Sequence, residues 1–189
     1  MVGQVVNAGV LALQGCIDPH VRMLEKCGAT VTRVRTVRDL EAVDRLILPG
    51  GESTTMLKLL DRAGLTSALR DFGKTKPMWG VCAGSILLAK EVRHPDQFSL
   101  ELIPVRATRN YYGSQIDSFK ASVEIPKLGE PLLVDFIRAP LLEALSDEVE
   151  VLGEFNDQQV LLRKGKIMVS SFHIELTEDQ RLHEYFCGI

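Results

Sequence analysis

Cys82 is the residue whose surroundings best suit covalent chemistry. It follows a short apolar run and precedes a helix-like run, and Gly80 and Gly84 stand two residues to either side of it. This spacing is that of a nucleophile elbow, a sharp strand-to-helix turn in which larger flanking side chains would collide with neighbouring backbone. A thiol there lies at a helix N-terminus, where N–H groups and the helix dipole favour the thiolate. We therefore predict that Cys82 is a nucleophile, although an isolated cysteine is more often a small buried hydrophobic residue.

A cysteine nucleophile needs a base, and the base needs an acceptor that orients it. His173 and Glu175 stand two residues apart at the end of a predicted strand, so their side chains leave the same face. We predict that His173 is the base and that Glu175 orients it, although this spacing is more common on solvated edge strands. We assign no chemistry to His94 in a loop, to His183 on the outer part of the last predicted helix, or to His20, a surface or packing residue.

A second glycine-containing turn could supply the remaining catalytic element. Residues 44–51 predict a strand that runs into Gly50-Gly51, and a helix is predicted to follow. A strand, a glycine pair and a helix N-terminus together present backbone N–H groups to an anion, as an oxyanion hole requires. Taken alone, however, a glycine pair is more often part of an ordinary strand-to-helix turn.

The elements that must position these residues alternate between strand and helix in the first half of the chain. Continuous apolar runs that end at glycine are typical of strands buried on both faces of a parallel sheet. The alternation predicts a doubly wound α/β sheet. The predicted strands cover 9–15, 30–34, 44–51 with its turn, and 77–81. The first predicted helix begins at Asp18-Pro19 and ends at Gly28, and the second runs from Met56 to about Arg62 behind a cap at Ser53 or Thr54. A third covers Leu65–Phe72, and a fourth extends from the elbow to Lys90.

The second half of the chain predicts strands without long helices between them. The complete fold is therefore expected to be α/β, a doubly wound, mostly parallel sheet flanked by helices, with an antiparallel strand region in the C-terminal half. The predicted strands are Leu100–Thr108, Phe119–Ile125, Leu132–Ile137 and an antiparallel meander over 148–154, 158–163 and 166–171. One or two helical turns are predicted at 139–144. A last helix is predicted to begin with a capping box formed by Thr177 and Gln180.

Length and composition fit one globular domain spanning residues 1–189. Hydrophobic residues make up 46% and charged residues 25%, and the formal net charge of −3 argues against a nucleic-acid partner. No apolar run is long enough to cross a bilayer and no basic residue precedes Arg22, so neither a membrane partner nor a secretion signal is expected. The four cysteines lack metal-ligand spacing, so we predict reduced thiols in a cytoplasmic protein with neither metal nor cofactor.

Several motifs carry a resemblance to a known family. The elbow around Cys82, together with His173-Ile174-Glu175, resembles the class I glutamine amidotransferases. Further blocks between about residue 9 and residue 186 narrow this to the glutaminase subunit of pyridoxal 5′-phosphate synthase. The more specific blocks are Pro-Gly-Gly-Glu-Ser-Thr-Thr at 49–55 and Arg-Asn-x-x-Gly-x-Gln-x-Asp-Ser-Phe at 109–119, and the others lie at 11–15 and 136–140.

The resemblance implies that L-glutamine and water give L-glutamate and ammonia, and that the ammonia passes to a separate (β/α)₈ synthase subunit. It implies that Cys82 forms a glutamyl thioester, that His173 moves the proton and that Glu175 orients His173. Backbone N–H groups of Gly51 and Ala83 are implied as the oxyanion hole. The implied glutamine-binding residues are Gly51, Glu52, Ser53, Arg109, Ile137 and Arg138.

Three residues near the implied chemistry depart from the family pattern. Ile174 stands where the family usually has a proline between the histidine and the glutamate. Val81 stands where a threonine is common, and Ser85 stands where a larger apolar residue is frequent. Isoleucine restricts the backbone less than proline does, so Ile174 could loosen the geometry of the His–Glu pair. One alternative is therefore a catalytically degenerate subunit of the same fold that only binds or regulates. Another is a different cysteine hydrolase on the same sheet, which the two specific blocks disfavour.

Overall fold

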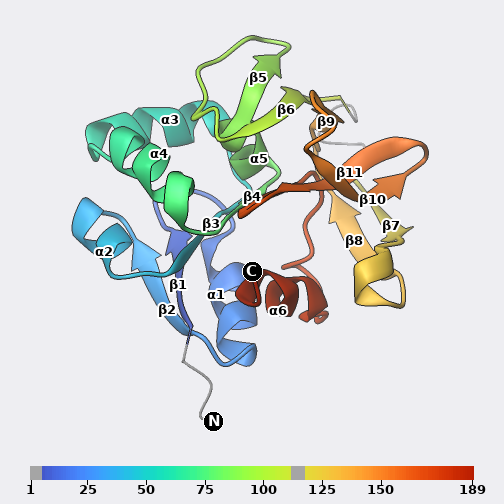
Figure 1. Ribbon diagram of the computed structural model, residues 1–189, viewed down its shortest axis with the longest axis horizontal. Coiled ribbons are helices and arrows are strands. Elements are labelled where there is room, and N and C mark those ends of the chain that lie inside the picture. The colour runs from blue at the N-terminus through green and yellow to red at the C-terminus, as the bar shows by residue number, and fades with distance from the viewer. Residues whose placement is uncertain (1–5, 112–117) are drawn as a thin grey trace.

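A ten-stranded sheet forms the centre of the computed structural model, which describes residues 6–111 and 118–189 (Figure 1). Its order is β2-β1-β3-β4-β12-β11-β9-β6-β5, and β10 pairs with β11. Each adjacent pair of strands from β2 to β12 in this order is parallel. Each adjacent pair from β12 through β11 and β9 to β6 is antiparallel. The strands are β1 (Asn7–Leu11), β2 (Thr30–Val34), β3 (Arg45–Leu48), β4 (Met78–Val81), β5 (Ala89–Arg93), β6 (Ile103–Thr108), β9 (Leu141–Ala144), β10 (Glu150–Phe155), β11 (Gln158–Lys164) and β12 (Ile167–Ser170).

Helices cover both faces of the parallel strands. In Figure 1, α1 and α6 lie on one side of the sheet, and α3, α4 and α5 lie on the other. Because successive residues of a strand face opposite sides, Leu46 and Leu48 join the core beneath α3, α4 and α5, whereas Ile47 joins the core beneath α1 and α6. The helices are α1 (Ile17–Lys26), α2 (Val37–Glu41), α3 (Ser53–Arg62), α4 (Thr66–Thr75), α5 (Ala83–Leu88) and α6 (Arg181–Cys187).

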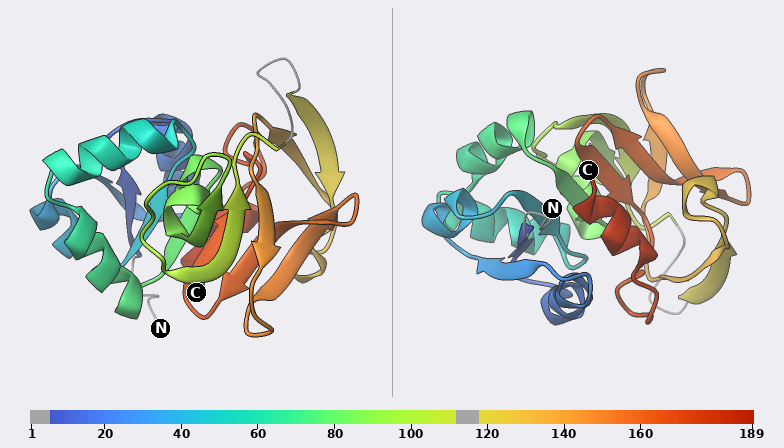
Figure 2. Two further views of the ribbon diagram at one scale, coloured as in Figure 1. Left: turned by 90° about the horizontal axis from the view of Figure 1, so that it is seen from above. Right: turned by 60° about the horizontal axis from the view of Figure 1, so that its bottom comes forward.

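A second, two-stranded antiparallel sheet consists of β7 (Phe119–Val123) and β8 (Leu132–Phe136), joined by the 3₁₀ turn η2 (Pro126–Leu128). Phe136 packs against Phe119 at a ring-centroid distance of 4.9 Å and against Phe155 of β10 at 5.4 Å, which ties the small sheet to the large one. Figure 2 shows the helix-covered parallel strands at one end of the molecule and the yellow and orange antiparallel strands at the other.

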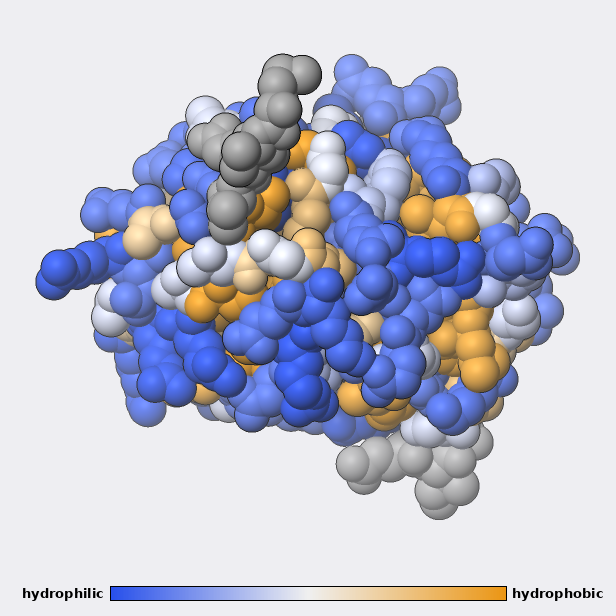
Figure 3. Space-filling model, turned by 90° about the horizontal axis from the view of Figure 1, so that it is seen from below, coloured by the Kyte–Doolittle hydropathy of each residue, from blue (hydrophilic) through white to orange (hydrophobic). Residues whose placement is uncertain are grey.

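The surface differs in character from these two cores. Hydrophilic side chains cover most of the face drawn in Figure 3, and hydrophobic ones form small areas between them. Within residues 6–111 and 118–189, no helix is both long and apolar enough to cross a membrane. Most large apolar side chains are instead packed on the two sides of the sheet.

The predicted fold class is confirmed, but the helical turns predicted at 139–144 are wrong. Residues Leu141–Ala144 form strand β9, which pairs antiparallel with β6 along four residue pairs and also meets Gln159 of β11. The Ala-Pro-Leu-Leu-Glu-Ala sequence favours helix locally, but bonds to two neighbouring strands satisfy its backbone and outweigh that preference.

Three predicted helix caps are also wrong, because other residues precede the three helices. Asp18 accepts a hydrogen bond from the Arg33 guanidinium at 2.8 Å. The Thr177 hydroxyl donates to the Ile174 carbonyl at 2.8 Å. The three helices begin at Ile17, Ser53 and Arg181, behind Cys16, Glu52 and Gln180, and none of these three preceding residues makes a side-chain cap bond.

Candidate active site

The carboxyl ends of three neighbouring parallel strands meet at one edge of the sheet. β3 leads into the Gly50-Gly51 turn, β4 leads into Cys82, and β12 leads into residues 171–175. β4 lies between the other two strands, and Ser170 is paired with Val81, so the chain leaves β4 and β12 side by side. Ligands of open α/β sheets bind at this edge.

The backbone of Cys82 is strained in the way an elbow requires. Its φ of 49° and ψ of −103° lie outside the regions that L-residues favour, and its amide donates to the Ser170 carbonyl at 2.8 Å. A Cβ on Gly80 would lie 2.5 Å from the Gly84 carbonyl oxygen, and one on Gly84 would lie 2.0 Å from that of Leu48. Both glycines are therefore required for the close approach of β3, β4 and α5.

His173 and Glu175 are brought together just beyond the end of β12. His173 Nδ1 lies 2.6 Å from Glu175 Oε1, and the two residues are 6% and 3% exposed. The backbone of His173 is fixed by Asp135 of β8, to which its amide donates at 2.7 Å and from whose amide its carbonyl accepts at 3.2 Å. The small sheet thus holds the predicted base in place.

The electrostatics of this pair favour its charged forms. Burial alone would lower the pKa of His173, but hydrogen bonds to Cys82 and Glu175 raise that pKa well above its usual value. Burial alone would raise the pKa of Glu175, but the adjacent His20 and the hydrogen bond and charge of His173 lower it. An ionised Glu175 therefore supports an imidazolium at His173, the form that can return a proton to a leaving group.

One pocket contains all the predicted site residues except Glu175. Its volume of about 260 Å³ lies below the roughly 300–1,000 Å³ of pockets for drug-sized ligands and suits a single amino acid. Glu175 is hidden behind His173. The lining includes Gly51, Glu52, Ser53, Cys82, Ala83, Arg109, Ile137, Arg138 and His173.

Charges of both signs face this pocket. Arg138 has a left-handed φ of 45°, and its guanidinium pairs with Glu52 Oε1 at 2.9 Å. Arg109 lies on the pocket wall as well. Guanidinium groups match a carboxylate, and Glu52 can accept from an ammonium, so the lining complements both charged groups of an α-amino acid. The Cys82 thiol donates to the Ile137 carbonyl at 3.8 Å, which places the sulfur beside the same wall.

The Gly50-Gly51 peptide is held in one orientation. The Gly50 carbonyl accepts from the Cys16 amide at 2.8 Å. The Gln14 side-chain oxygen accepts from the Glu52 amide at 2.9 Å and fixes the other side of the turn. In a trans peptide the N–H points opposite to the carbonyl, so the bond from Cys16 also sets the direction of the Gly51 N–H.

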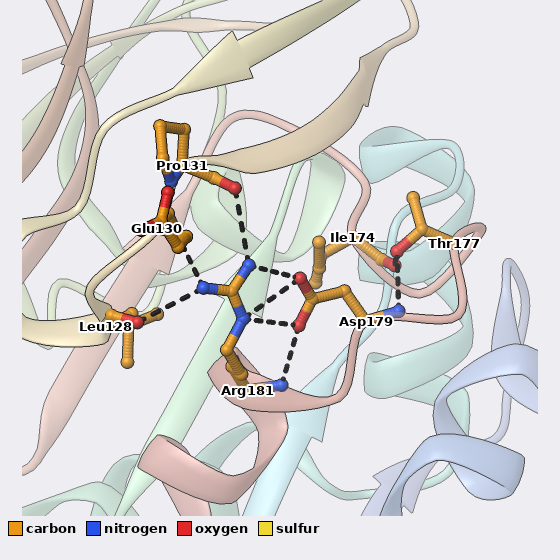
Figure 4. A network of polar contacts seen from close by, with 7 residues as sticks. All are labelled: Leu128, Glu130, Pro131, Ile174, Thr177, Asp179 and Arg181. Carbon is orange, nitrogen blue, oxygen red and sulfur yellow. Dashed lines mark hydrogen bonds and ion pairs between the residues drawn. The ribbon is translucent and has the colours of Figure 1, made fainter.

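A separate polar network fixes the segment that follows Glu175 (Figure 4). Arg181 pairs with the Asp179 carboxylate and donates to the carbonyl oxygens of Glu130 at 2.7 Å and Leu128 at 3.2 Å, so it joins the start of α6 to the loop before β8. The Asp179 amide donates in turn to Thr177 at 3.2 Å. The chain is therefore anchored shortly after Glu175.

The three departures from the family pattern all lie inside the protein. The Ile174 and Val81 side chains are fully buried. The Ser85 hydroxyl lies 2.8 Å from the Gly80 carbonyl oxygen and 2.7 Å from that of Ser170, which share its one proton, and it accepts from the Ser170 amide at 3.1 Å. Although Ile174 was expected to loosen the pair, the 2.6 Å contact between His173 and Glu175 is present beside it.

Two histidines lie buried near Glu175, and the predicted position is wrong only for His183. His20, predicted to be a surface or packing residue, is fully buried with Nε2 3.6 Å from Glu175 Oε1. His183, predicted on the outer part of the last helix, is also fully buried, with Nε2 2.9 Å from His20 Nδ1. Cys16 lines the pocket, and its spacing of one helical turn from His20 was a signal that could have placed both on one side of α1.

One group of side chains has the composition of a metal site. Cys16, His173 and Glu175 each place a ligand atom within 4.8 Å of the others. The short His173–Glu175 hydrogen bond already uses one atom of each, so we group these two residues with Cys82 as a candidate catalytic triad. Residues 112–117 of the block at 109–119 lie outside the described part of the chain.

Known proteins share both the sequence and the fold. The model of the SNO glutamine amidotransferase family matches residues 10–188. "Pyridoxal 5′-phosphate synthase subunit PdxT" of Kosmotoga olearia is 46% identical over 96% of each chain. The protein of that name from Geobacillus thermodenitrificans is 47% identical over 97% of this chain and 95% of its own. A crystal structure described as a glutamine amidotransferase matches with a TM-score of 0.90 and 41% identity, over 96% of this chain and 99% of the other.

Proposed function

Since this chain belongs to the SNO glutamine amidotransferase family, we propose that it is the subunit of a pyridoxal 5′-phosphate synthase that hydrolyses L-glutamine to L-glutamate and ammonia. The observation that carries this proposal is the arrangement of Cys82, His173 and Glu175 at one sheet edge, beside a pocket of amino-acid size. Cysteine, imidazole and carboxylate in this order are the parts of an acyl-transfer site.

The first half of the reaction is acylation. His173 takes the thiol proton of Cys82, and the thiolate attacks the side-chain amide carbon of glutamine. His173 then gives that proton to the amide nitrogen, the C–N bond breaks, and ammonia leaves a glutamyl thioester behind. Glu175 keeps Nδ1 of His173 occupied, so Nε2 is the nitrogen free to exchange the proton.

The second half is hydrolysis of the thioester. His173 removes a proton from water, the hydroxide adds to the thioester carbon, and the C–S bond breaks to release glutamate. The Cys82 sulfur regains its proton from His173, so the enzyme returns to its starting state. Both halves pass through a tetrahedral oxyanion, for which we propose the N–H groups of Gly51 and Ala83 as donors.

Substrate recognition follows from the charges in the pocket. We propose that Arg109 and Arg138 hold the α-carboxylate of glutamine and that Glu52 accepts from its ammonium group. Gly51, Ser53 and Ile137 would complete the binding site. The Arg138–Glu52 pair places the two charges next to each other before substrate arrives, and glutamine carries the same two charges on one carbon.

The ammonia requires an acceptor on another protein. We propose that this acceptor site belongs to a (β/α)₈ synthase subunit and that the two chains work together in the cytoplasm. Free ammonia is protonated near neutral pH and then no longer acts as a nucleophile. Direct transfer between subunits avoids this loss.

The test is a comparison of wild type with Cys82→Ala and Cys82→Ser in the complex with a cognate synthase. Glutamine hydrolysis should fall to background in both variants, with thermal melting unchanged. A reactive glutamine analogue followed by peptide mapping should label wild type at Cys82. A wild-type chain that binds the synthase without being labelled would point to the degenerate regulatory subunit instead.

A further inference from the structure

The side of Glu175 that faces away from the pocket carries a buried polar chain that the proposed reaction does not use. His20 of α1 and His183 of α6 are fully buried and belong to opposite parts of the sequence. His20 Nε2 lies 3.6 Å from Glu175 Oε1, and His20 Nδ1 lies 2.9 Å from His183 Nε2. His173, Glu175, His20 and His183 thus form a continuous row that leads from the pocket into the core.

Aromatic rings enclose the two histidines. The Trp79 ring meets His20 edge-on at 5.7 Å and His183 at 4.9 Å between ring centroids. The Trp79 N–H is already bonded to the Ser170 hydroxyl at 3.0 Å, so it is not available to either imidazole. The ionisable groups that interact with the two histidines, besides each other, are therefore Glu175 and His173.

The contacts decide where the protons lie. A bare nitrogen of His20 would repel the carboxylate of Glu175, so Nε2 carries the proton and Nδ1 is an acceptor. The 2.9 Å contact then requires that His183 donates through Nε2–H. His183 Nδ1, which has no hydrogen-bond partner among the described residues, is left as a bare acceptor. Burial lowers the pKa of both histidines, that of His183 to about 3, which agrees with two neutral rings.

We propose that His20 and His183 are positioning residues behind the Cys82–His173–Glu175 triad: neutral His20, whose Nε2 has no hydrogen-bond partner among the described residues, directs its N–H at Glu175 across 3.6 Å, and neutral His183 donates to His20. This inference rests on the proposed glutaminase function. Glu175 Oε1 then faces two imidazoles, His173 in front and His20 behind, while Oε2 is buried with no hydrogen-bond partner among the described residues. The neutral chain orients the carboxylate without adding a charge that would compete for it.

A carboxylate held from one side only can rotate. Without His20, Glu175 would keep His173 and the nearby Cys16 thiol as polar neighbours. Rotation would change the direction in which Nε2 of His173 points at Cys82. The defect should therefore appear in turnover and in the pH dependence of the thiol, and not in glutamine affinity, because neither buried histidine lines the pocket.

The matched variants are His20→Gln and His20→Leu. A glutamine side chain can place an amide N–H near the position of Nε2, whereas leucine fills similar space without a donor. In the complex with a cognate synthase, His20→Leu should lower kcat roughly 10–100-fold with KM unchanged, the effect seen when hydrogen-bond partners behind functional histidines are removed. His20→Gln should recover most of the rate. Equal kcat in the two variants would overturn the proposal.

Two measurements separate positioning from general packing. The rate of Cys82 alkylation by iodoacetamide against pH should shift in His20→Leu and stay unshifted in His20→Gln. Nitrogen-15 NMR of the wild-type imidazoles at pH 7 should show neutral His20 with its proton on Nε2 and neutral His183 with its proton on Nε2. A charged His20, or one protonated at Nδ1, would contradict the chain even if His20→Leu failed to fold. The NMR result does not depend on turnover, so a wild type that hydrolyses no glutamine would defeat only the proposed function.

Discussion

Gly50 lies so close to the proposed base that no side chain fits between them. A Cβ on Gly50 would lie 2.2 Å from Cε1 of His173, well inside contact distance. Gly50→Ala should therefore displace His173 and reduce glutamine hydrolysis by a factor of about a hundred or more, as the loss of a catalytic group does. The measurement is kcat in the synthase complex. Gly188→Ala is the control, because the nearest atom to its Cβ would be 3.4 Å away, and it should retain activity.

The buried histidines also determine how stability depends on pH. The pKa of His20 and of His183 is lower in the folded than in the unfolded state, so the unfolded chain binds more protons below about pH 6.5. Stability should then fall as pH drops from 6.5 towards 5. The pKa of His173 is raised, so it is protonated in both states in this window and adds no slope.

His183→Gln removes one of these titrations while keeping an N–H donor towards His20. Each neutral buried histidine contributes a slope of up to about 1.4 kcal/mol per pH unit to the free energy of unfolding. The variant should lower the slope between pH 6.5 and 5 by about that amount in urea unfolding series. An unchanged slope would mean that His183 is already protonated in the folded protein.

At the scale of elements, Ser85 joins three parts of the fold. Its hydroxyl reaches the Gly80 carbonyl at the end of β4 and both backbone groups of Ser170 at the end of β12. Ser85→Ala would deprive the Ser170 amide of this acceptor inside the core, which costs about 1–3 kcal/mol. Urea unfolding should show this loss. Ser85→Ala should also alter the rate of Cys82 alkylation. Val92→Ala is the control, because Val92 lies in the core beneath the same helix but away from these strand ends, and it should leave that rate unchanged.

Elements with a strong local signal could be predicted from the sequence. β2 could be predicted at its observed bounds, because polar and apolar residues alternate along it. The start of α2 also has a local signal, the Thr36–Asp39 capping box. β5 and β9 could not be predicted, because helix-favouring residues there become strands only through their pairing with β6.

The candidate site divides in the same way. Cys82 and the His173–Glu175 pair could be predicted because glycine spacing and strand alternation are local patterns. His20 and His183 could not, because their partners come together only when α1 and α6 pack on the same face of the sheet. Sequence separation of 163 residues hides that contact from any local rule.

At the scale of the whole molecule, the pocket contains the proposed glutamine-binding residues, and the proposed reaction yields ammonia for a partner subunit. We predict that glutamine hydrolysis by the isolated chain is slow and rises at least about tenfold when a cognate synthase binds. We expect the Gly50-Gly51 peptide to link synthase binding to activity. The hydrogen bond from the Cys16 amide sets the orientation of this peptide, and glycine at both positions allows the peptide to rotate. Docking that selects one orientation shifts the population towards an active oxyanion hole.

The measurement compares ammonia release by the purified chain with and without the synthase, at saturating glutamine. Equal rates would refute the partner dependence. Cys16→Pro serves as a probe of the route, because it removes the amide that bonds Gly50, and it should change the ratio of the two rates.

The position of β12 in the sheet has a consequence for synthesis of the protein on the ribosome. This strand comes late in the chain, yet it fills the place between β4 and β11. Before residues 167–170 emerge, β4 has an unpaired edge of four apolar positions that are fully buried in the finished protein. Such an edge is a site of aggregation, so the nascent chain is vulnerable until β12 has emerged and paired with β4. Because His173 and Glu175 follow β12 directly, the proposed base and its partner reach Cys82 only after this strand has been made.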